Sequence, residues 1–156
     1  MQVEELMRSK FIPKVLSNLG YEELIKEIDD KINSFGDPNQ LLHAIINILN
    51  NAKDALKIAS NVSEKLVFIF SINENENNII ITIKDNAGGI EEDIVDKIFE
   101  PYFTTKHQTQ GTGLGLYMTH QIIEKMGGSI SVQNENFEFE GSVCYGAKFI
   151  ISLPLS

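Results

Sequence analysis

Three glycines alternate with other residues in the stretch Gly111, Thr112, Gly113, Leu114, Gly115 and Leu116. Because glycine is costly inside helices and strands, this spacing predicts a loop in which a ligand lies against the backbone. Apolar spacing after the loop predicts a helix over 114–126, which ends at Gly127 and Gly128. The first amide N–H groups of such a helix lack partners and carry partial positive charge, so they favour phosphate. A glycine-rich surface turn is the alternative, and only agreement with other motifs excludes it.

A second polar pattern lies on a helix predicted over 38–58, which Asp37 or Asn39 can cap. One face of this helix is apolar and carries Leu42, Ile45, Ile46, Leu49, Ala52 and Leu56. The other face is polar and carries His43, Asn47, Asn50, Asn51 and Asp54. Asparagine is a poor helix former because its side chain competes for backbone hydrogen bonds. We therefore favour a ligand-facing strip over a solvated polar face, which usually carries Glu and Lys.

A carboxylate stands where the next predicted strand, 79–83, runs into a glycine pair. Asp85 is followed by Gly88 and Gly89. At a strand end, Asp85 could accept a hydrogen bond from the 6-amino group of adenine, whereas guanine presents an acceptor there and is repelled. Gly89 would let the backbone approach the flat face of the base. Taken alone, this segment is more typical of a turn that ends a strand.

A nucleotide bound to this chain would need local positive charge, because the net charge is −9. Mg²⁺ prefers oxygen ligands and shares them among protein, phosphates and water. The amide oxygen of Asn51 suits it, and Asn47, one turn earlier, could supply a second ligand or hold a water. Amides of the glycine loop together with Lys106 would then hold the phosphates. A solvated surface lysine is the alternative for Lys106.

The remaining patterns place these motifs in an α+β sandwich with helices over one sheet face. Apolar spacing predicts a helix over 21–33 and a short helix over 93–99. Alternation and β-branched residues predict a hairpin over 66–72 and 79–83 and two further strands over 129–133 and 147–153. The polar segment 134–146 is left without an assigned form.

Composition limits the classes of function. The 156 residues fit one domain, and the acidic balance argues against nucleic-acid partners and against anionic membranes. Cys144 is the only cysteine, which excludes a disulfide framework and fits a strand or core residue. No apolar run approaches the roughly 18 residues needed to span a bilayer. We therefore expect a cytoplasmic fragment without membrane insertion, whose parent protein could still be membrane-anchored.

Four segments together resemble one known family, the ATP-binding catalytic domain of sensor histidine kinases. Residues 47–55 resemble its N box, 85–90 its G1 box, 99–106 its F box and 111–116 its G2 box. Their order and spacing match, and the resemblance covers about residues 37–154. The superfamily has the Bergerat (GHKL) fold and includes DNA gyrase B, the Hsp90 chaperones and the MutL-type repair ATPases.

The resemblance implies a two-layer α/β sandwich whose mixed, mostly antiparallel sheet is covered on one face by about three helices. It implies ATP and Mg²⁺ as ligands, with the metal at Asn51 and adenine at Asp85. It implies that catalysis involves Asn47, Asn51 and Lys106 and that the lid spans 99–112. The further nucleotide-binding residues that it implies are Gly89, Ile90, Thr104, Thr105, Gly111, Thr112, Gly113, Leu114, Gly115 and Leu116. The lid length and the N box resemble the nitrogen-regulation type of sensor kinase.

The resemblance further implies a two-component kinase that transfers the γ-phosphoryl group to a histidine on a dimerisation domain and serves a response regulator indirectly. Residues 37–156 would be the catalytic domain and 1–36 the remnant of a linker. His43, His107 and His120 lie outside the context of the family's acceptor histidine, so we expect the acceptor in a part of the parent that this chain lacks.

Two other functions of the same fold stay open. One is a nucleotide-binding regulatory module or an anti-sigma-type Ser kinase. The other is a hydrolytic ATPase, which is the weakest because Asn47 stands where those enzymes carry a water-activating Glu. Two positions also depart from the family pattern, since Ala87 and Thr109 replace glycines. A positive φ at Ala87 would cost about 1 kcal/mol.

Overall fold

A computed structural model of the chain describes residues 15–16, 38–59, 65, 67–73, 78–103 and 114–154. The strands are β1 Val15–Leu16, β2 Val67–Asn73, β3 Asn78–Asp85, β4 Ser129–Phe139 and β5 Ser142–Pro154. The helices are α3 Pro38–Ile58 and α4 Gly115–Lys125, with a 3₁₀ turn at Val95–Lys97. The helix predicted over 21–33 lies outside the described residues.

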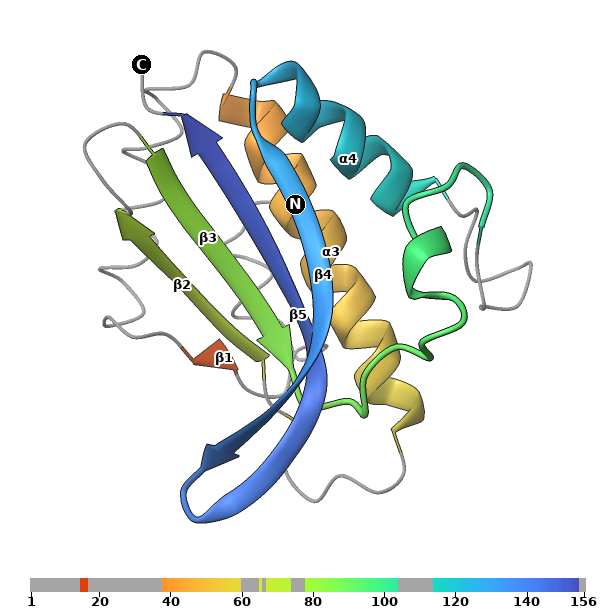
Figure 1. Cartoon of the computed structure of the whole chain (residues 1–156), viewed down its shortest axis with the longest axis vertical. Coiled ribbons are helices and arrows are strands. Elements are labelled where there is room, and N and C mark those ends of the chain that lie inside the picture. Colours follow the sequence, from red (N-terminus) through yellow and green to blue (C-terminus); the bar gives the residue numbers. More distant parts are fainter. Residues whose placement is uncertain are drawn as a thin grey trace.

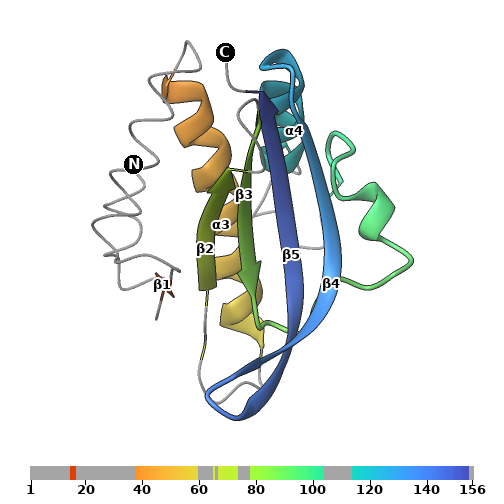
Figure 2. The same cartoon turned by 60° about the vertical axis from the view of Figure 1, so that its left-hand side comes forward.

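The strands form one sheet in the order β1-β2-β3-β5-β4. β1 runs parallel to β2, and the other neighbouring pairs are antiparallel, so the predicted mixed, mostly antiparallel sheet is confirmed. Figures 1 and 2 show α3 and α4 packed together over one face of this sheet. The α+β sandwich expected from the sequence is therefore the observed fold.

The hydrophobic core lies between the sheet and the helices. Alternate residues of the central strands are buried there: Ile79, Ile81 and Ile83 of β3, and Ala147, Phe149, Ile151 and Leu153 of β5. This period of two places Asp85, two residues beyond Ile83, at the end of the same buried row. The strand pattern thus directs a carboxylate into the layer where the helices lie.

The buried stripe of α3 is wider than the sequence suggested. Four predicted positions, Ile45, Leu49, Ala52 and Leu56, are buried, whereas Ile46 is only half-buried. The stripe also takes in Leu41, Ala44 and Ile48. Because α3 packs against both β3 and α4, it must present apolar side chains in two directions. The side chain of Leu42 lies outside the described residues.

The segment 134–146, left unassigned from the sequence, extends the last two predicted strands into one long hairpin. β4 and β5 pair without interruption from Ser129 with Ser152 to Phe139 with Ser142. Glu140 and Gly141 connect them with φ of 51° and 81°, the positive pair of a two-residue type I′ turn. Figures 1 and 2 show the far half of this hairpin projecting past the end of β3, and we call residues 134–147 the arm.

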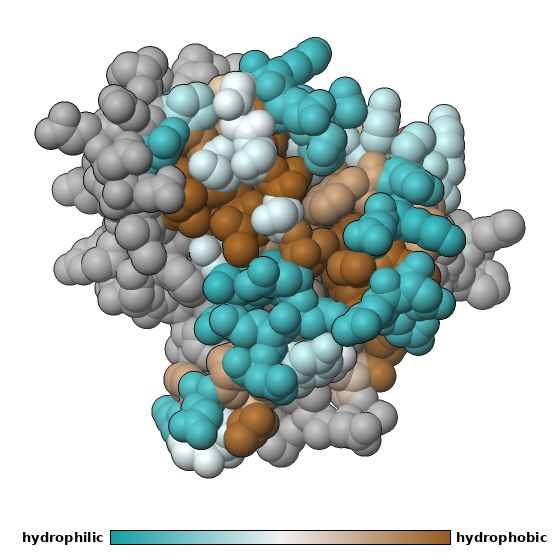
Figure 3. All heavy atoms as spheres, viewed as in Figure 1, coloured by the Kyte–Doolittle hydropathy of each residue, from teal (hydrophilic) through white to brown (hydrophobic). Residues whose placement is uncertain are grey.

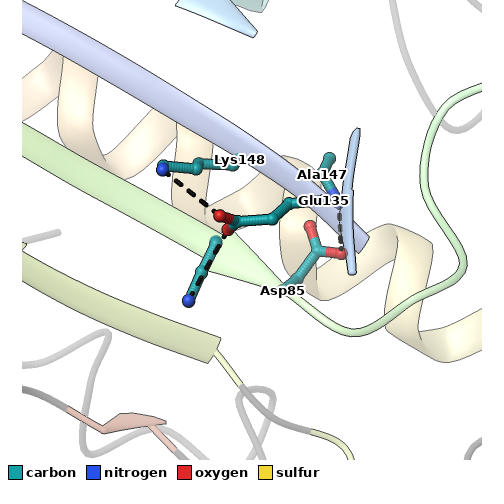
Figure 4. A network of polar contacts seen from close by, with 5 residues as sticks. Asp85, Glu135, Ala147 and Lys148 are labelled. Atoms are coloured by element: carbon teal, nitrogen blue, oxygen red, sulfur yellow. Dashed lines mark hydrogen bonds and ion pairs between the residues drawn. The ribbon is translucent and has the colours of Figure 1, made fainter. Parts of the chain in front are cut away.

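The sheet face away from the helices carries a charged cluster. Lys84 of β3 and Lys148 of β5 are direct cross-strand neighbours, so their like charges repel. Glu135 of β4 offsets this, with Oε2 3.6 Å from the Lys84 Nζ and Oε1 3.5 Å from the Lys148 Nζ (Figure 4). The three side chains are partly exposed, so each pair contributes at most about 1 kcal/mol. Figure 3 shows hydrophilic side chains gathered across the middle of this face.

Candidate nucleotide-binding site

Asp85, the candidate adenine reader, is buried at the end of β3 with 4% of its surface exposed. Its Oδ1 accepts a hydrogen bond from the backbone N–H of Ala87 at 3.0 Å. It accepts a second from the backbone N–H of Ala147 at 3.4 Å (Figure 4). Burial raises the pKa of the carboxyl from 3.8 to about 6, and the two backbone hydrogen bonds oppose that rise. Asp85 is therefore a buried acceptor that is mostly ionised at neutral pH.

Gly146 of β5 allows this arrangement, although the sequence analysis did not identify it. A Cβ at Gly146 would collide with the carbonyl oxygen of Asp85 and lie 2.8 Å from its Oδ1. Only glycine therefore lets β5 pass this close to the aspartate. The available signal was a glycine inside a run of strand-forming residues, which is typical of a close backbone approach.

The loop after Asp85 turns through two glycines, and its conformation answers the question raised by Ala87. Gly88 and Gly89 have φ of 98° and 79°, whereas Ala87 has a negative φ and is unstrained. The loss of glycine at position 87 therefore carries no backbone penalty. The N–H of Gly88 donates to the carbonyl of Tyr145 at 3.0 Å, so the loop is fixed to the arm.

Asn134 of β4 makes a second connection between this loop and the arm. Its Oδ1 accepts from the N–H of Ile90 at 2.8 Å, and its Nδ2 donates to the carbonyl of Ile90 at 2.7 Å. A Cβ on Gly89 would lie 2.8 Å from the Asn134 Oδ1 and 2.9 Å from the ring of Tyr145. A side chain at Gly89 would therefore clash with the arm, so glycine at this position lets the loop pack closely against it.

Asn47 joins the two helices that carry the other motifs. Its Nδ2 donates to the carbonyl of Gly115 and to Oγ1 of Thr119, both at 3.2 Å. Thr119, which is fully buried, donates in turn to the carbonyl of Gly115 at 2.9 Å. Because a carbonyl can only accept, the amide nitrogen of Asn47 must face α4. Its amide oxygen takes part in neither of these two bonds.

The start of α4 presents its backbone N–H groups toward the preceding segment. Leu114 precedes the helix and makes no side-chain capping hydrogen bond, so the N–H groups of the first turn lack a cap from that residue. Gly115 is exposed, and Leu116 is half-buried against the core. The half-buried Asn51 lies one turn after Asn47 on α3. The structure therefore brings the N box against the end of the predicted glycine loop.

Several predicted site residues lie outside the described residues, namely Thr104, Thr105, Lys106, Gly111, Thr112 and Gly113. Of the predicted lid, residues 99–103 are described. Phe99 anchors them, because its ring lies 5.6 Å from that of His120 on α4 and 6.3 Å from that of Phe149 on β5. Phe103 also packs against the core. The base of the lid is thereby attached to both layers.

Comparison with known proteins decides the family. Residues 36–156 match the family described as histidine kinase-, DNA gyrase B-, and HSP90-like ATPase. The chain belongs to this ATPase family. The family that the four motifs suggested is thus confirmed. Separately, no helix among the described residues is both long and apolar enough to cross a bilayer.

Relatives within this ATPase family include sensor kinases. The two-component sensor PprA of Pseudomonas aeruginosa is 38% identical over 122 residues, which are 78% of this chain and 12% of PprA. Sporulation kinase E of Bacillus subtilis is 36% identical over 128 residues, 82% of this chain and 15% of that kinase. The chain therefore spans only a small part of these relatives. The solved catalytic domain of the histidine kinase ThkA superposes with a TM-score of 0.61 at 26% identity, covering 86% of this chain and 93% of that domain.

Proposed function

We propose that this chain is the catalytic domain of a two-component sensor histidine kinase, which binds Mg-ATP and transfers its γ-phosphoryl group to a histidine on a dimerisation domain. The observation that carries the proposal is the buried Asp85, which accepts hydrogen bonds from the backbone N–H groups of Ala87 and Ala147 at the strand end. Burying a carboxylate without a cationic partner in these bonds lowers the stability of the fold. Such a residue is typical of a ligand-binding site.

Adenine fits this carboxylate better than guanine does. The 6-amino group of adenine would donate to Asp85, whereas the 6-oxygen of guanine would face its negative charge. The loop of Gly88 and Gly89 would border the same base. Ile90, half-buried and in contact with the core, would add apolar surface beside it.

The phosphates would lie where α3 and α4 meet. Asn51 would offer an amide oxygen to Mg²⁺, and the amide oxygen of Asn47 would offer a second or hold a water. When bound, Mg²⁺ would neutralise part of the phosphate charge. The N–H groups of the first turn of α4, with the glycine loop, Thr104, Thr105 and Lys106, would bind the phosphate oxygens.

The phosphoacceptor would lie on another part of the parent protein. PprA and sporulation kinase E are far longer than this chain, so there is room in such a parent for a dimerisation domain. His43 is exposed on α3, whereas His120 is half-buried on α4 with its ring 5.6 Å from that of Phe99, and neither lies in the context of the family's acceptor histidine. A response regulator would receive the phosphoryl group afterwards, and the parent could be membrane-anchored with this domain in the cytoplasm.

Hydrolysis is disfavoured by the environment of Asn47. An amide cannot take a proton from water, and its nitrogen is already bonded to Gly115 and Thr119. A role in positioning and charge stabilisation is what phosphoryl transfer requires of such a domain.

Calorimetric titration with ADP, ATP and GDP, with and without Mg²⁺, tests the binding part. We expect adenine nucleotides to bind in preference to GDP. We expect Asp85→Asn to lower the affinity for ATP about 10- to 100-fold, because it removes a charged hydrogen-bond acceptor. Asp96→Asn, at an exposed carboxylate on the 3₁₀ turn, is the matched control. Unchanged ATP affinity in Asp85→Asn would remove this residue from the site.

The transfer part needs the dimerisation domain of the parent added in trans with γ-labelled ATP. We expect label on histidine, which is lost in acid and stable in base. Label on serine of a partner protein would instead support the anti-sigma type of kinase. Nucleotide binding without any transfer would support a regulatory module.

A further inference from the structure

The arm is joined at several points to Asp85 and to the loop that follows it, residues 86–90. Three of these points are backbone contacts of the arm: the hydrogen bond from Gly88 to Tyr145, the hydrogen bond from Ala147 to Asp85, and the close approach at Gly146. The fourth is the pair of hydrogen bonds between the Asn134 side chain and the Ile90 backbone. Of these, only the last depends on a side chain of the arm. Its identity is therefore open to mutation without altering a backbone group.

The double hydrogen bond of Asn134 fixes position and orientation together. One hydrogen bond lets a peptide group rotate about it, whereas a donor and an acceptor on the same planar amide hold both N–H and C=O of Ile90. Asn134 also lies against Gly89, the residue next to Ile90. The loop that follows Asp85 is thus held along two consecutive residues.

We propose that Asn134 is a positioning residue of the adenine subsite, which holds the 88–90 loop at the spacing from Asp85 that the purine needs. This inference rests on the proposed nucleotide binding and deepens it. Asn134 acts through Gly89 and Ile90 and does not bind the phosphates, so its loss weakens recognition of the base and leaves the effect of Mg²⁺ unchanged.

The test compares Asn134→Ala and Asn134→Asp with the wild type in titrations with ADP and GDP, with and without Mg²⁺. The alanine variant loses both bonds to Ile90. The aspartate variant keeps the size of the side chain but sets an oxygen against the Ile90 carbonyl. We expect both variants to bind ADP about tenfold more weakly and to lose most of the preference for ADP over GDP. The ratio of affinities with and without Mg²⁺ should stay at the wild-type value.

Asn136→Ala is the matched control, because Asn136 is exposed and lies two residues further along β4. It should leave ADP affinity and base preference unchanged. A purely structural role for Asn134 predicts a lower melting temperature with an unaltered preference for ADP over GDP, and that result overturns the proposal. Failure of the wild type to bind any adenine nucleotide overturns the proposed function itself, and this inference with it.

Discussion

At the scale of single residues, Asp85 combines a useful acceptor with an unfavourable environment. Its carboxyl is 4% exposed, and burial raises its pKa to about 6. At neutral pH the folded protein therefore holds an ionised group that would be better solvated in the unfolded chain. Such a residue is expected where selection for binding outweighs selection for stability.

The pKa of Asp85 predicts how stability depends on pH. A carboxyl whose pKa rises from 3.8 to about 6 on folding stabilises the fold below pH 4, and this contribution is lost as the pH rises through 6. This pKa shift corresponds to a free energy of unfolding that is about 3 kcal/mol lower above pH 7, where Asp85 is ionised, than below pH 4. We expect Asp85→Asn to unfold at higher urea concentration than the wild type at pH 8, with the difference shrinking toward pH 4. Equal midpoints at pH 8 would contradict the assigned burial.

At the scale of elements, Asn47 and Thr119 couple the two helices of the site. Thr119 is fully buried and lies between the amide of Asn47 and the carbonyl of Gly115. The start of α4 is thereby held against α3 by side-chain hydrogen bonds as well as by packing. Because these bonds reach the first turn of α4, they also set where the N–H groups of that turn point.

The pair Thr119→Val and Thr119→Ser separates the hydroxyl from the methyl group. Valine keeps the side-chain volume but removes the hydroxyl that accepts one of the two hydrogen bonds from Asn47. We therefore expect the free energy of unfolding in urea to fall by about 1–2 kcal/mol. The affinity for Mg-ATP should fall as well. Serine keeps the hydroxyl and should retain nucleotide affinity close to that of the wild type. If the two variants bind Mg-ATP equally well, the hydroxyl does not position α4.

Local sequence signals were sufficient for the two long helices, whereas the short helix predicted over 93–99 is only a 3₁₀ turn at Val95–Lys97. The helices predicted over 38–58 and 114–126 match α3 and α4 within a residue or so, because each has a long apolar period. The arm escaped prediction because Glu140 adopts the left-handed conformation usually taken by Asn, Asp or Gly in a two-residue turn.

Site residues divide in the same way. Asp85 could be proposed from the sequence because a carboxylate there follows a strand and precedes two glycines, and its role in binding stays a prediction. Asn134 and Gly146 were not, because their roles depend on which strand lies beside the loop. Strand order is set by packing over the whole sheet, and one sequence does not reveal it. The nitrogen-regulation subgroup and the division at residues 36 and 37 stay predictions.

At the scale of the whole molecule, the site draws on both layers. Asp85 and the arm belong to the sheet, whereas Asn47 and Gly115 belong to the helices. A nucleotide that contacts all of them would bind the folded state and not the unfolded one. Nucleotide binding should therefore stabilise the entire domain rather than one loop.

Thermal unfolding with nucleotide checks this coupling. At ADP concentrations near 100 times the dissociation constant, the free energy of unfolding should rise by about 2.7 kcal/mol in a single cooperative transition. GDP at the same concentration should give a much smaller rise. A first transition that ADP leaves unshifted would mean that the layers unfold separately.

β4 is the last strand of the described sheet, so one whole side of its backbone has no neighbouring strand there. An exposed edge strand can pair with strands of other molecules and start aggregation. The outward positions of β4 oppose this, because Ser129, Ser131, Gln133, Asn136 and Glu138 are all exposed and polar. We therefore expect the polar outer side of β4 to oppose self-association in concentrated solutions of the protein.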